Sequence, residues 1–131
     1  MSSPSTAPST TTSDAAAVEA AARDYIEGWY TGDAERMERS LHDDLVKRIP
    51  VEGDGSGATE LRMVSKERMV ELTTAGGGTD VADPAIGIFV DDVSVDIACA
   101  RVVCADFLDY VHLVKTSAGW KIANVIFRSL G

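Results

Sequence analysis

The C-terminal third of the chain most constrains the fold, because it consists of four consecutive segments that are typical of β-strands. Each is rich in Val, Ile, Phe or Tyr, which strands favour, and each is long for a strand of a globular protein. The segments are residues 86–97, 100–106, 107–116 and 119–129. In the first, the alternation of apolar residues changes phase at Asp91 and Asp92, which predicts a β-bulge there.

The last two segments predict a hairpin around the sequence TSAG, residues 116–119. An even loop pairs Lys115 with Trp120 and Leu113 with Ile122. Continued without interruption, this register places Asp109, Val111, Leu113, Trp120, Ile122, Asn124 and Ile126 on one face, and Leu108, Tyr110, His112, Val114, Lys121, Ala123, Val125 and Phe127 on the other. Both faces are largely apolar, so we expect the sheet to be covered on both sides. Helices can cover one face, and a second subunit is the natural cover for the other.

Three helices are predicted before these strands. The first runs from an N-cap at Asp14 to Gly32. Its apolar residues recur at helical spacing and include Val18, Ala22, Tyr25 and Trp29. Asp33 caps a short second helix, a hairpin of residues 45–51 and 61–64 follows, and Ser65 caps the third helix. This order predicts an α+β fold in which a strongly curved sheet wraps around the helices.

Composition narrows the function. The net charge is −9, and no basic patch is present, which argues against nucleic-acid binding. No run approaches the roughly 18 apolar residues that a membrane span needs. Residues 1–13 are rich in Ser, Thr and Pro and lack the features of a secretory signal, so we expect a disordered tail before a single domain at residues 14–131. Cys99 and Cys104 are expected to be small buried residues of a cytoplasmic protein.

Two candidate site residues lie near the end of the first helix, and a third, His42, lies where the second helix passes into a loop. Tyr25 is either a core tyrosine with a satisfied hydroxyl or a hydrogen-bond donor in a cavity. Trp29, one turn later, either packs in the core or floors the pocket. His42 is either an acid–base group oriented by a neighbouring carboxylate, or a histidine whose charge is favoured at a helix C-terminus.

No metal site and no cofactor are expected. The two histidines lie about seventy residues apart in the sequence, with no Cys or carboxylate at ligand spacing. The glycine-rich segments lack both the Lys-Ser/Thr of a phosphate loop and the strand-to-helix setting of a dinucleotide fold.

The order of elements and three stretches resemble the nuclear transport factor 2-like superfamily. The stretches are YIEGWYTGD (25–33), HDDLVKR (42–48) and DYVHLVKTSAGWKIANVIF (109–127). Within the superfamily the chain is most similar to a bacterial group named for lumazine binding, over roughly residues 14–130. The resemblance implies a cone-shaped barrel, in which a strongly curved, mostly antiparallel sheet wraps around three N-terminal helices. It also implies an internal cavity and a homodimer paired through the sheets.

Ketosteroid isomerases belong to the same superfamily. In them a tyrosine of the first helix donates to an oxyanion, and Tyr25 stands in that position. Their general-base aspartate comes just before the proline that follows the first strand, and here the residue before Pro50 is Ile49. An alkyl side chain cannot abstract a proton, so isomerase chemistry by that route is not expected. Asp109 is an approximate counterpart of their strand aspartate, which stays neutral to donate a hydrogen bond.

We therefore expect a small-molecule-binding protein with an internal, mostly apolar cavity. The ligand-binding candidates are Tyr25, Trp29, His42, Asp109 and Tyr110. The predicted register puts Asp109 and Tyr110 on opposite faces, and which face is concave stays open. One alternative is a polyketide-cyclase-, dehydratase- or isomerase-like enzyme with His42 or Asp109 as its acid–base group. Another is a non-catalytic dimerisation module. No nucleic-acid or membrane partner is expected.

Overall fold

The computed structural model describes residues 6–52 and 57–130. Within these ranges the helices are α1 (Thr6–Thr31), α2 (Ala34–Ser40) and α3 (Lys66–Thr74). The strands are β1 (Leu41–Glu52), β2 (Ala58–Ser65), β3 (Gly87–Ser94), β4 (Ile97–Val103), β5 (Phe107–Thr116) and β6 (Gly119–Ser129). The predicted order of helices and strands is confirmed.

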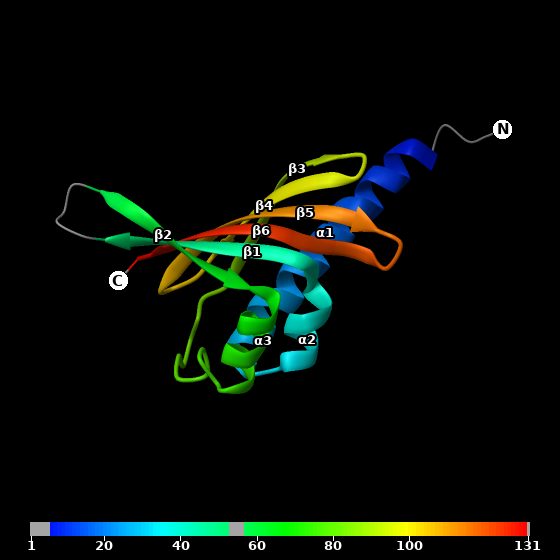
Figure 1. Cartoon of the computed structure of the whole chain (residues 1–131). Helices are drawn as coiled ribbons and strands as arrows, with labels where there is room; N and C mark the ends of the chain where they lie inside the picture. The colour runs from blue at the N-terminus through cyan, green and yellow to red at the C-terminus, as the bar shows by residue number, and fades with distance from the viewer. Residues whose placement is uncertain (1–5, 53–56, 131) are drawn as a thin grey trace.

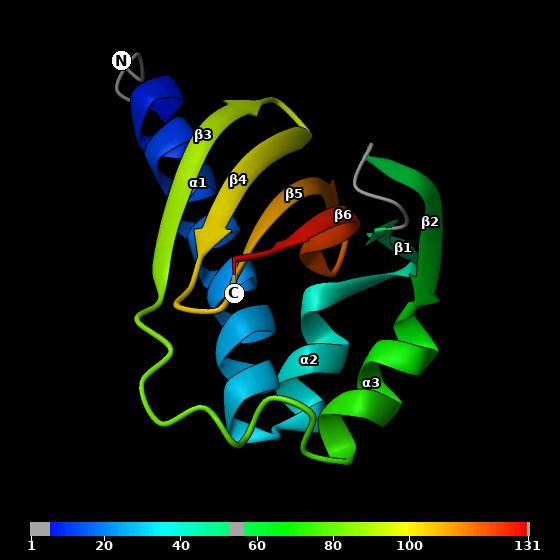
Figure 2. The ribbon, with the colours of Figure 1, turned by 90° about the vertical axis from the view of Figure 1, so that its left-hand side faces the viewer.

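The strands form one mixed sheet in the order β2-β1-β6-β5-β4-β3. Neighbouring strands are antiparallel except β1 and β6, which are parallel. The sheet curves strongly, and all three helices lie on one side of it (Figure 1, Figure 2). It stays open, with β2 and β3 as its edges. The α+β fold, a curved and mostly antiparallel sheet wrapped around helices, is therefore confirmed.

The core fills the space between the helices and the concave face of the sheet. From α1 it takes Val18, Ala22, Tyr25 and Ile26, which recur every three or four residues and are almost fully buried. From β5 and β6 it takes Val111, Leu113, Ile122 and Val125. Burying these apolar side chains is the main stabilising contribution to the domain.

The predicted end of α1 and the predicted starts of α2 and α3 are confirmed. Gly32 follows α1 with a φ of +72°, in the left-handed region that favours glycine. The side chain of Asp33 accepts a hydrogen bond from a backbone N–H in the first turn of α2, and Ser65 does the same for α3. These caps make the α1–α2 turn and the β2–α3 junction short and defined.

The predicted register of the last hairpin is confirmed only as far as the pair Leu113–Ile122. Ala123 is then left unpaired, and the register shifts by one residue. A small apolar residue in an apolar strand carries no signal of such a bulge. The bulge that was predicted in β3 is confirmed, because its register shifts between Val90 and Asp92.

The bulge at Ala123 reverses the alternation of side chains along the rest of β6, because successive residues point to opposite faces. Val125 and Phe127 lie on the helix side, whereas Asn124 and Ile126 face outwards, the reverse of the prediction. Val125 is 2% exposed and Ile126 is 43% exposed.

Other differences lie near the N-terminal helices. α1 begins at Thr6, so Asp14 lies inside this helix and is not its N-cap. α1 includes residues 6–13 of the expected tail, and residues 1–5 lie outside the described ranges. β1 follows α2 directly, so His42 belongs to a strand rather than to a helix–loop junction. In the described part of the chain, no helix combines the length and the apolar character that crossing a membrane requires.

The register beyond Ala123 can be tested by stability measurements. Val125→Ala should lower the free energy of unfolding by about 2 kcal/mol, because it leaves a cavity in the core. Asn124→Ala, the matched control on the outer face, should change it by no more than about 0.5 kcal/mol. Urea unfolding followed by circular dichroism measures both. A larger loss of stability for Asn124→Ala than for Val125→Ala would mean that the uninterrupted register is correct.

Candidate functional site

Three polar side chains from distant parts of the chain meet inside the core. Tyr25 comes from α1, Lys47 from β1 and Asp109 from β5. The Tyr25 hydroxyl donates to Oδ2 of Asp109 at 2.6 Å, and Lys47 Nζ donates to the Tyr25 hydroxyl oxygen at 2.9 Å. Lys47 Nζ lies 3.9 Å from Asp109 Oδ2. The tyrosine oxygen therefore bridges an amine and a carboxyl group, and we call these three residues the buried triad.

The local sequence positions each member of the buried triad. Tyr25 lies on the buried stripe of α1, so its ring points at the sheet. Asp109 occupies a buried position in the alternating pattern of β5. Lys47 takes the inward position between Leu45 and Ile49 on β1, because side chains two residues apart share a face of a strand.

Burial shifts the protonation of all three groups. It raises the pKa of the Asp109 carboxyl and lowers the pKa of the Lys47 ammonium, because charged forms lose their hydration in the core. Burial, reinforced by the neighbouring Asp109, raises the pKa of the Tyr25 hydroxyl well above its usual value. Attraction between Lys47 and Asp109 acts in the opposite direction but is weaker than burial. Each of these pKa shifts is towards the uncharged form of its group.

One atom of the buried triad lacks a partner. Oδ1 of Asp109 is buried and, among the described residues, has no hydrogen-bond partner. Leaving a buried polar atom unsatisfied costs about 1–3 kcal/mol, and most such atoms in folded proteins are paired. The buried triad thus offers one free hydrogen-bonding position, an acceptor when Asp109 is ionised and a donor when Oδ1 carries the proton.

Aromatic rings surround the amine. Lys47 Nζ lies 5.5 Å from the ring centroid of Tyr25, 5.8 Å from that of Phe107 and 5.0 Å from that of Phe127. Phe107 also stacks on Tyr30, with the two rings 9° from parallel. The rings keep water from the amine, and their faces stabilise the ammonium form when it is present.

A buried cysteine lies near this ring cluster. The hydroxyl of Tyr30 donates to Asp106 and is also close to the thiol of Cys104. Burial raises the pKa of the Cys104 thiol to about 11. Because the thiolate is the reactive form, Cys104 is not a nucleophile at neutral pH and acts as a small core residue.

Two of the five predicted ligand-binding residues meet in the buried triad. Tyr25 and Asp109 converge, so the face of β5 that carries Asp109 is the concave one. Tyr110 points the other way and is 52% exposed on the outer face of the sheet. The choice between the two faces, which the sequence left open, is thereby made.

Trp29 packs against a loop. Its ring lies on Gly77 and Gly78, where an added Cβ at either position would come within 2.5 Å of a ring atom. The missing side chains let the loop after α3 approach α1 closely. This contact supports the packing interpretation of Trp29.

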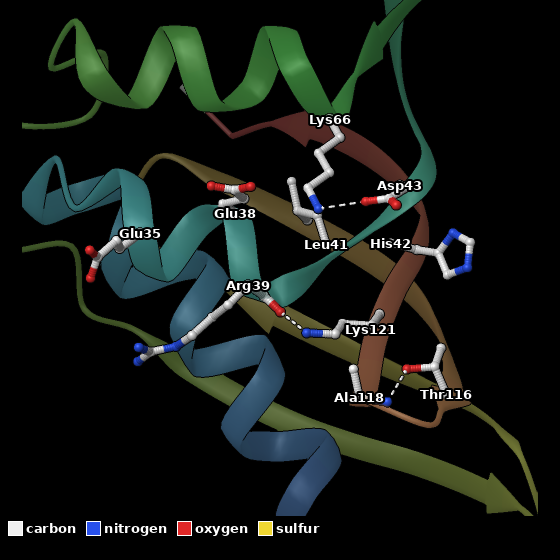
Figure 3. Close-up of a pocket in the computed structure, with 10 residues that line it drawn as sticks. All are labelled: Glu35, Glu38, Arg39, Leu41, His42, Asp43, Lys66, Thr116, Ala118 and Lys121. Carbon is white, nitrogen blue, oxygen red and sulfur yellow. Dashed lines mark hydrogen bonds and ion pairs between the residues drawn. The ribbon is translucent and has the colours of Figure 1, made fainter.

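His42 lines a groove of about 590 Å³ beside α2 and the start of α3 (Figure 3). Two charged side chains of this groove pair with each other, and a third binds the backbone. Lys66 pairs with Asp43 at 2.9 Å, and Lys121 donates to the backbone carbonyl of Arg39. Nothing in this arrangement converges on the imidazole of His42.

The contacts of His42 are local. Its Nδ1 accepts a hydrogen bond from the backbone N–H of Asp44 at 3.0 Å. The carboxylate of Asp44 is 4.0 Å from the same nitrogen, beyond hydrogen-bond length. This pattern orients the ring without giving it the carboxylate partner that an acid–base histidine needs.

Four of the pockets on the described part of the surface have volumes of about 450–590 Å³. Tyr25, Lys47 and Asp109 line none of these four. One of them, of about 570 Å³, includes Phe127, whose ring is part of the cluster around the amine. An internal cavity at the buried triad stays a prediction.

Lys47 was not predicted from the sequence. The available signal was its place in LVKRIP (residues 45–50), where it alternates with Leu45 and Ile49 and so occupies the apolar face of its strand. Ile49 is the next inward residue of β1 and packs against the core. At the position that resembles the general base of the isomerases, this chain carries the alkyl side chain of Ile49. The nearest inward polar group on β1 is the amine of Lys47.

Tyr25→Phe tests the bridging hydroxyl. Without it, Asp109 and Lys47 both lose a hydrogen bond in the core, so the free energy of unfolding should fall by about 2–3 kcal/mol. The same change at Tyr110, which is half exposed, should leave it within about 0.5 kcal/mol. Denaturant unfolding of the two variants decides this. Equal stability of both would mean that the hydroxyl of Tyr25 is not a structural bridge.

The lowered pKa of Lys47 predicts a pH dependence. Between its folded value and its ordinary value of 10.5, the unfolded chain binds more protons, so stability rises with pH. The contribution of Lys47 is therefore present above pH 10.5 and lost as pH falls through the folded pKa.

Unfolding of the wild type and of Lys47→Met between pH 7 and 10 measures this contribution, because the tyrosines and cysteines titrate in both proteins and cancel in the difference. The wild type should gain relative to Lys47→Met as pH rises. A constant difference would show that Lys47 keeps its ordinary pKa.

Comparisons with known proteins agree with this fold. The family described as "Putative lumazine-binding" matches residues 13–128. No curated protein is significantly similar to the chain.

Solved structures show the same architecture. An NTF-2 like protein of unknown function from Silicibacter pomeroyi is 20% identical, with a TM-score of 0.68 over 87% of this chain and 93% of that one. An NTF2-like protein of unknown function from Shewanella baltica is 18% identical, with a TM-score of 0.67 over 88% and 92%. A ketosteroid isomerase-like protein from Erwinia carotovora atroseptica is 18% identical, with a TM-score of 0.60 over 90% and 97%.

At these identities the structural likeness establishes the fold alone. The family match spans nearly the whole domain, including the segments that carry Tyr25, Lys47 and Asp109. The chain therefore belongs to the family described as "Putative lumazine-binding", and it shares the fold of the NTF2-like proteins.

Proposed function

We propose that this protein binds a small organic molecule between the helices and the concave face of the sheet, with the polar end of the ligand at the buried triad. The observation that carries the proposal is the unpartnered Oδ1 of Asp109. A ligand hydroxyl, ring N–H or carbonyl oxygen placed there would satisfy this atom in one of its two protonation states.

The surroundings of the buried triad suit a flat or moderately apolar ligand. Phe107, Phe127 and Tyr30 present ring faces near the amine of Lys47. Sites of this kind, mostly apolar with a few convergent polar groups, are typical of small-molecule pockets. The family description names lumazine, a flat heterocycle with both ring N–H donors and carbonyl acceptors, which makes lumazine the first probe.

Phe127 lies between the buried triad and the surface. Its half-buried ring is 5.0 Å from the amine of Lys47, and it also lines a surface groove of about 570 Å³.

A second candidate is an enzyme that transfers protons within the same site. The specific observation in its favour is the unbroken hydrogen-bond chain from Lys47 through Tyr25 to Asp109, together with the raised pKa of Asp109. Such coupled groups with perturbed pKa values are found at active sites. Asp109 would then be the acid–base group, and His42, with no converging partner, would not.

We also propose a homodimer paired through the outer face of the sheet. One cross-strand row on this face consists of Phe89, Arg101, Tyr110, Ile126, Arg48 and Met63. The four apolar or aromatic members are between 43% and 69% exposed. Exposed apolar side chains gathered in one row, here with Arg101 and Arg48 between them, are typical of a protein interface, and a second copy of the chain would cover them. In the absence of any ligand, the protein would be a non-catalytic dimerisation module.

Native mass spectrometry of the purified protein is the first experiment, because it reads the subunit number and any bound molecule together. We expect a dimer that retains a small molecule or added lumazine. Tyr25→Phe should lose the ligand and Tyr110→Phe should keep it, since only the first alters the buried triad.

Conversion of the retained molecule to a product would favour the enzyme. A dimer that stays empty with every probe would favour the association module and overturn the binding proposal. A monomer would contradict the proposed dimer paired through the sheet.

A further inference from the structure

The amine of Lys47 has the surroundings of a nucleophile. Lys47 is 7% exposed, and three aromatic rings lie within 6 Å of its Nζ. A phenol oxygen lies 2.9 Å away and a carboxyl oxygen 3.9 Å away. A lysine that is desolvated in an apolar pocket is available as a free amine, the form that attacks carbonyl carbon.

We propose that Lys47 forms a reversible imine with an aldehyde or ketone, with Tyr25 and Asp109 moving the protons of the reaction. This assigns a carbonyl compound as the ligand class. The proposal rests on the proposed function in one respect, because the ligand must reach the buried triad. It adds a covalent bond that binding alone does not need.

In the first step the Lys47 nitrogen attacks the carbonyl carbon. The new N–C bond forms as the π pair of the carbonyl moves to its oxygen. One proton passes from the nitrogen to that oxygen through the hydroxyl of Tyr25, which already accepts from Nζ. The product is a neutral carbinolamine.

In the second step the carbinolamine loses water. Asp109, as the carboxylic acid, supplies a proton to the leaving hydroxyl group. The nitrogen lone pair then forms the C=N bond. An amine, a carboxylic acid and a carbonyl compound thus become a protonated imine, a carboxylate and water, and no oxidant or reductant takes part.

The buried triad suits both the reactants and the product of this reaction. Before it, burial of Lys47 and Asp109 favours the neutral amine and the neutral acid. After it, the iminium and the carboxylate form an ion pair at the distance that now separates amine and carboxyl. The N–H of the iminium can donate to the Tyr25 hydroxyl as the lysine does now.

The other three lysines of the chain provide internal controls. Lys66 pairs with Asp43, Lys115 pairs with Asp14, and Lys121 donates to a backbone carbonyl. Each lies nearer the surface than Lys47. Each unit by which a lysine pKa falls raises its fraction of free amine at neutral pH roughly tenfold, so the reaction at pH 7 should select Lys47.

The experiment uses the full chain with butanal or benzaldehyde at pH 7, followed by sodium cyanoborohydride to reduce the imine to a stable amine. Intact mass spectrometry counts the adducts, and peptide mapping locates them. We expect Lys47 to be labelled faster than Lys66, Lys115 or Lys121, by about tenfold for each unit by which its pKa is lowered. Mapping on the wild type needs no variant to fold.

Variants then test the roles of the residues. Lys47→Arg should lose the preferred adduct, and Lys66→Arg should keep it. Tyr25→Phe, measured on folded protein, should slow labelling of Lys47 by about 100-fold, the scale of a lost proton-transfer group, while labelling of Lys66 stays unchanged. If Tyr25 had a purely structural role, its loss would not slow the labelling of Lys47 while the labelling of Lys66 stayed unchanged.

Labelling confined to the surface lysines would overturn the imine. If native mass spectrometry still finds a molecule that Tyr25→Phe releases, the proposed binding function stands and only the covalent step fails. If neither a retained molecule nor an adduct on Lys47 appears, both fail.

Discussion

The hydroxyl group of Tyr25 holds together two polar groups that come from different strands of the sheet. β1 and β5 lie on either side of β6, so in a flat sheet their backbones would be about 9.6 Å apart. The strong curvature of the sheet and the long side chain of Lys47 bring amine and carboxyl to 3.9 Å. The hydroxyl from α1 then occupies the position between them. Helix packing, sheet curvature and the polar centre of the core therefore depend on one another.

The bulge at Ala123 determines which side chains surround that centre. Because one residue is left unpaired, Phe127 turns to the concave face and stands opposite Asp109. Without the bulge Ile126 would take that place, and Lys47 would lose one of its three rings. The same shift sends Ile126 outwards, next to Tyr110. A single unpaired residue thus shapes both the interior site and the proposed dimer face.

The proposed functions use the same physical features in different ways. An unsatisfied carboxyl oxygen and a ring of aromatic faces suit the binding of a small molecule. A desolvated amine beside a phenol and a carboxylic acid adds the means to form and break a covalent bond with it. The groove at His42 has a volume of about 590 Å³ and is lined mainly by charged and polar side chains, of which Lys66 and Asp43 pair with each other. The described residues that line it include none of the aromatic rings that surround the amine of Lys47.

The sequence by itself determined the α+β fold, the order of helices and strands, the caps of α2 and α3 and the bulge in β3, because each depends on local periodicity or on one capping residue. It also singled out Tyr25 and Asp109, through the resemblance to a known superfamily. Three features were decided only by the tertiary structure: the bulge at Ala123, the concave face, and the place of Lys47 beside Tyr25. A bulge in an evenly apolar strand cannot be predicted from the local sequence, because the apolar pattern does not change there. The role of a lysine on an inward face depends on the residues that packing places next to it. The local sequence does not predict these three features, because each depends on contacts between residues that are far apart in the chain.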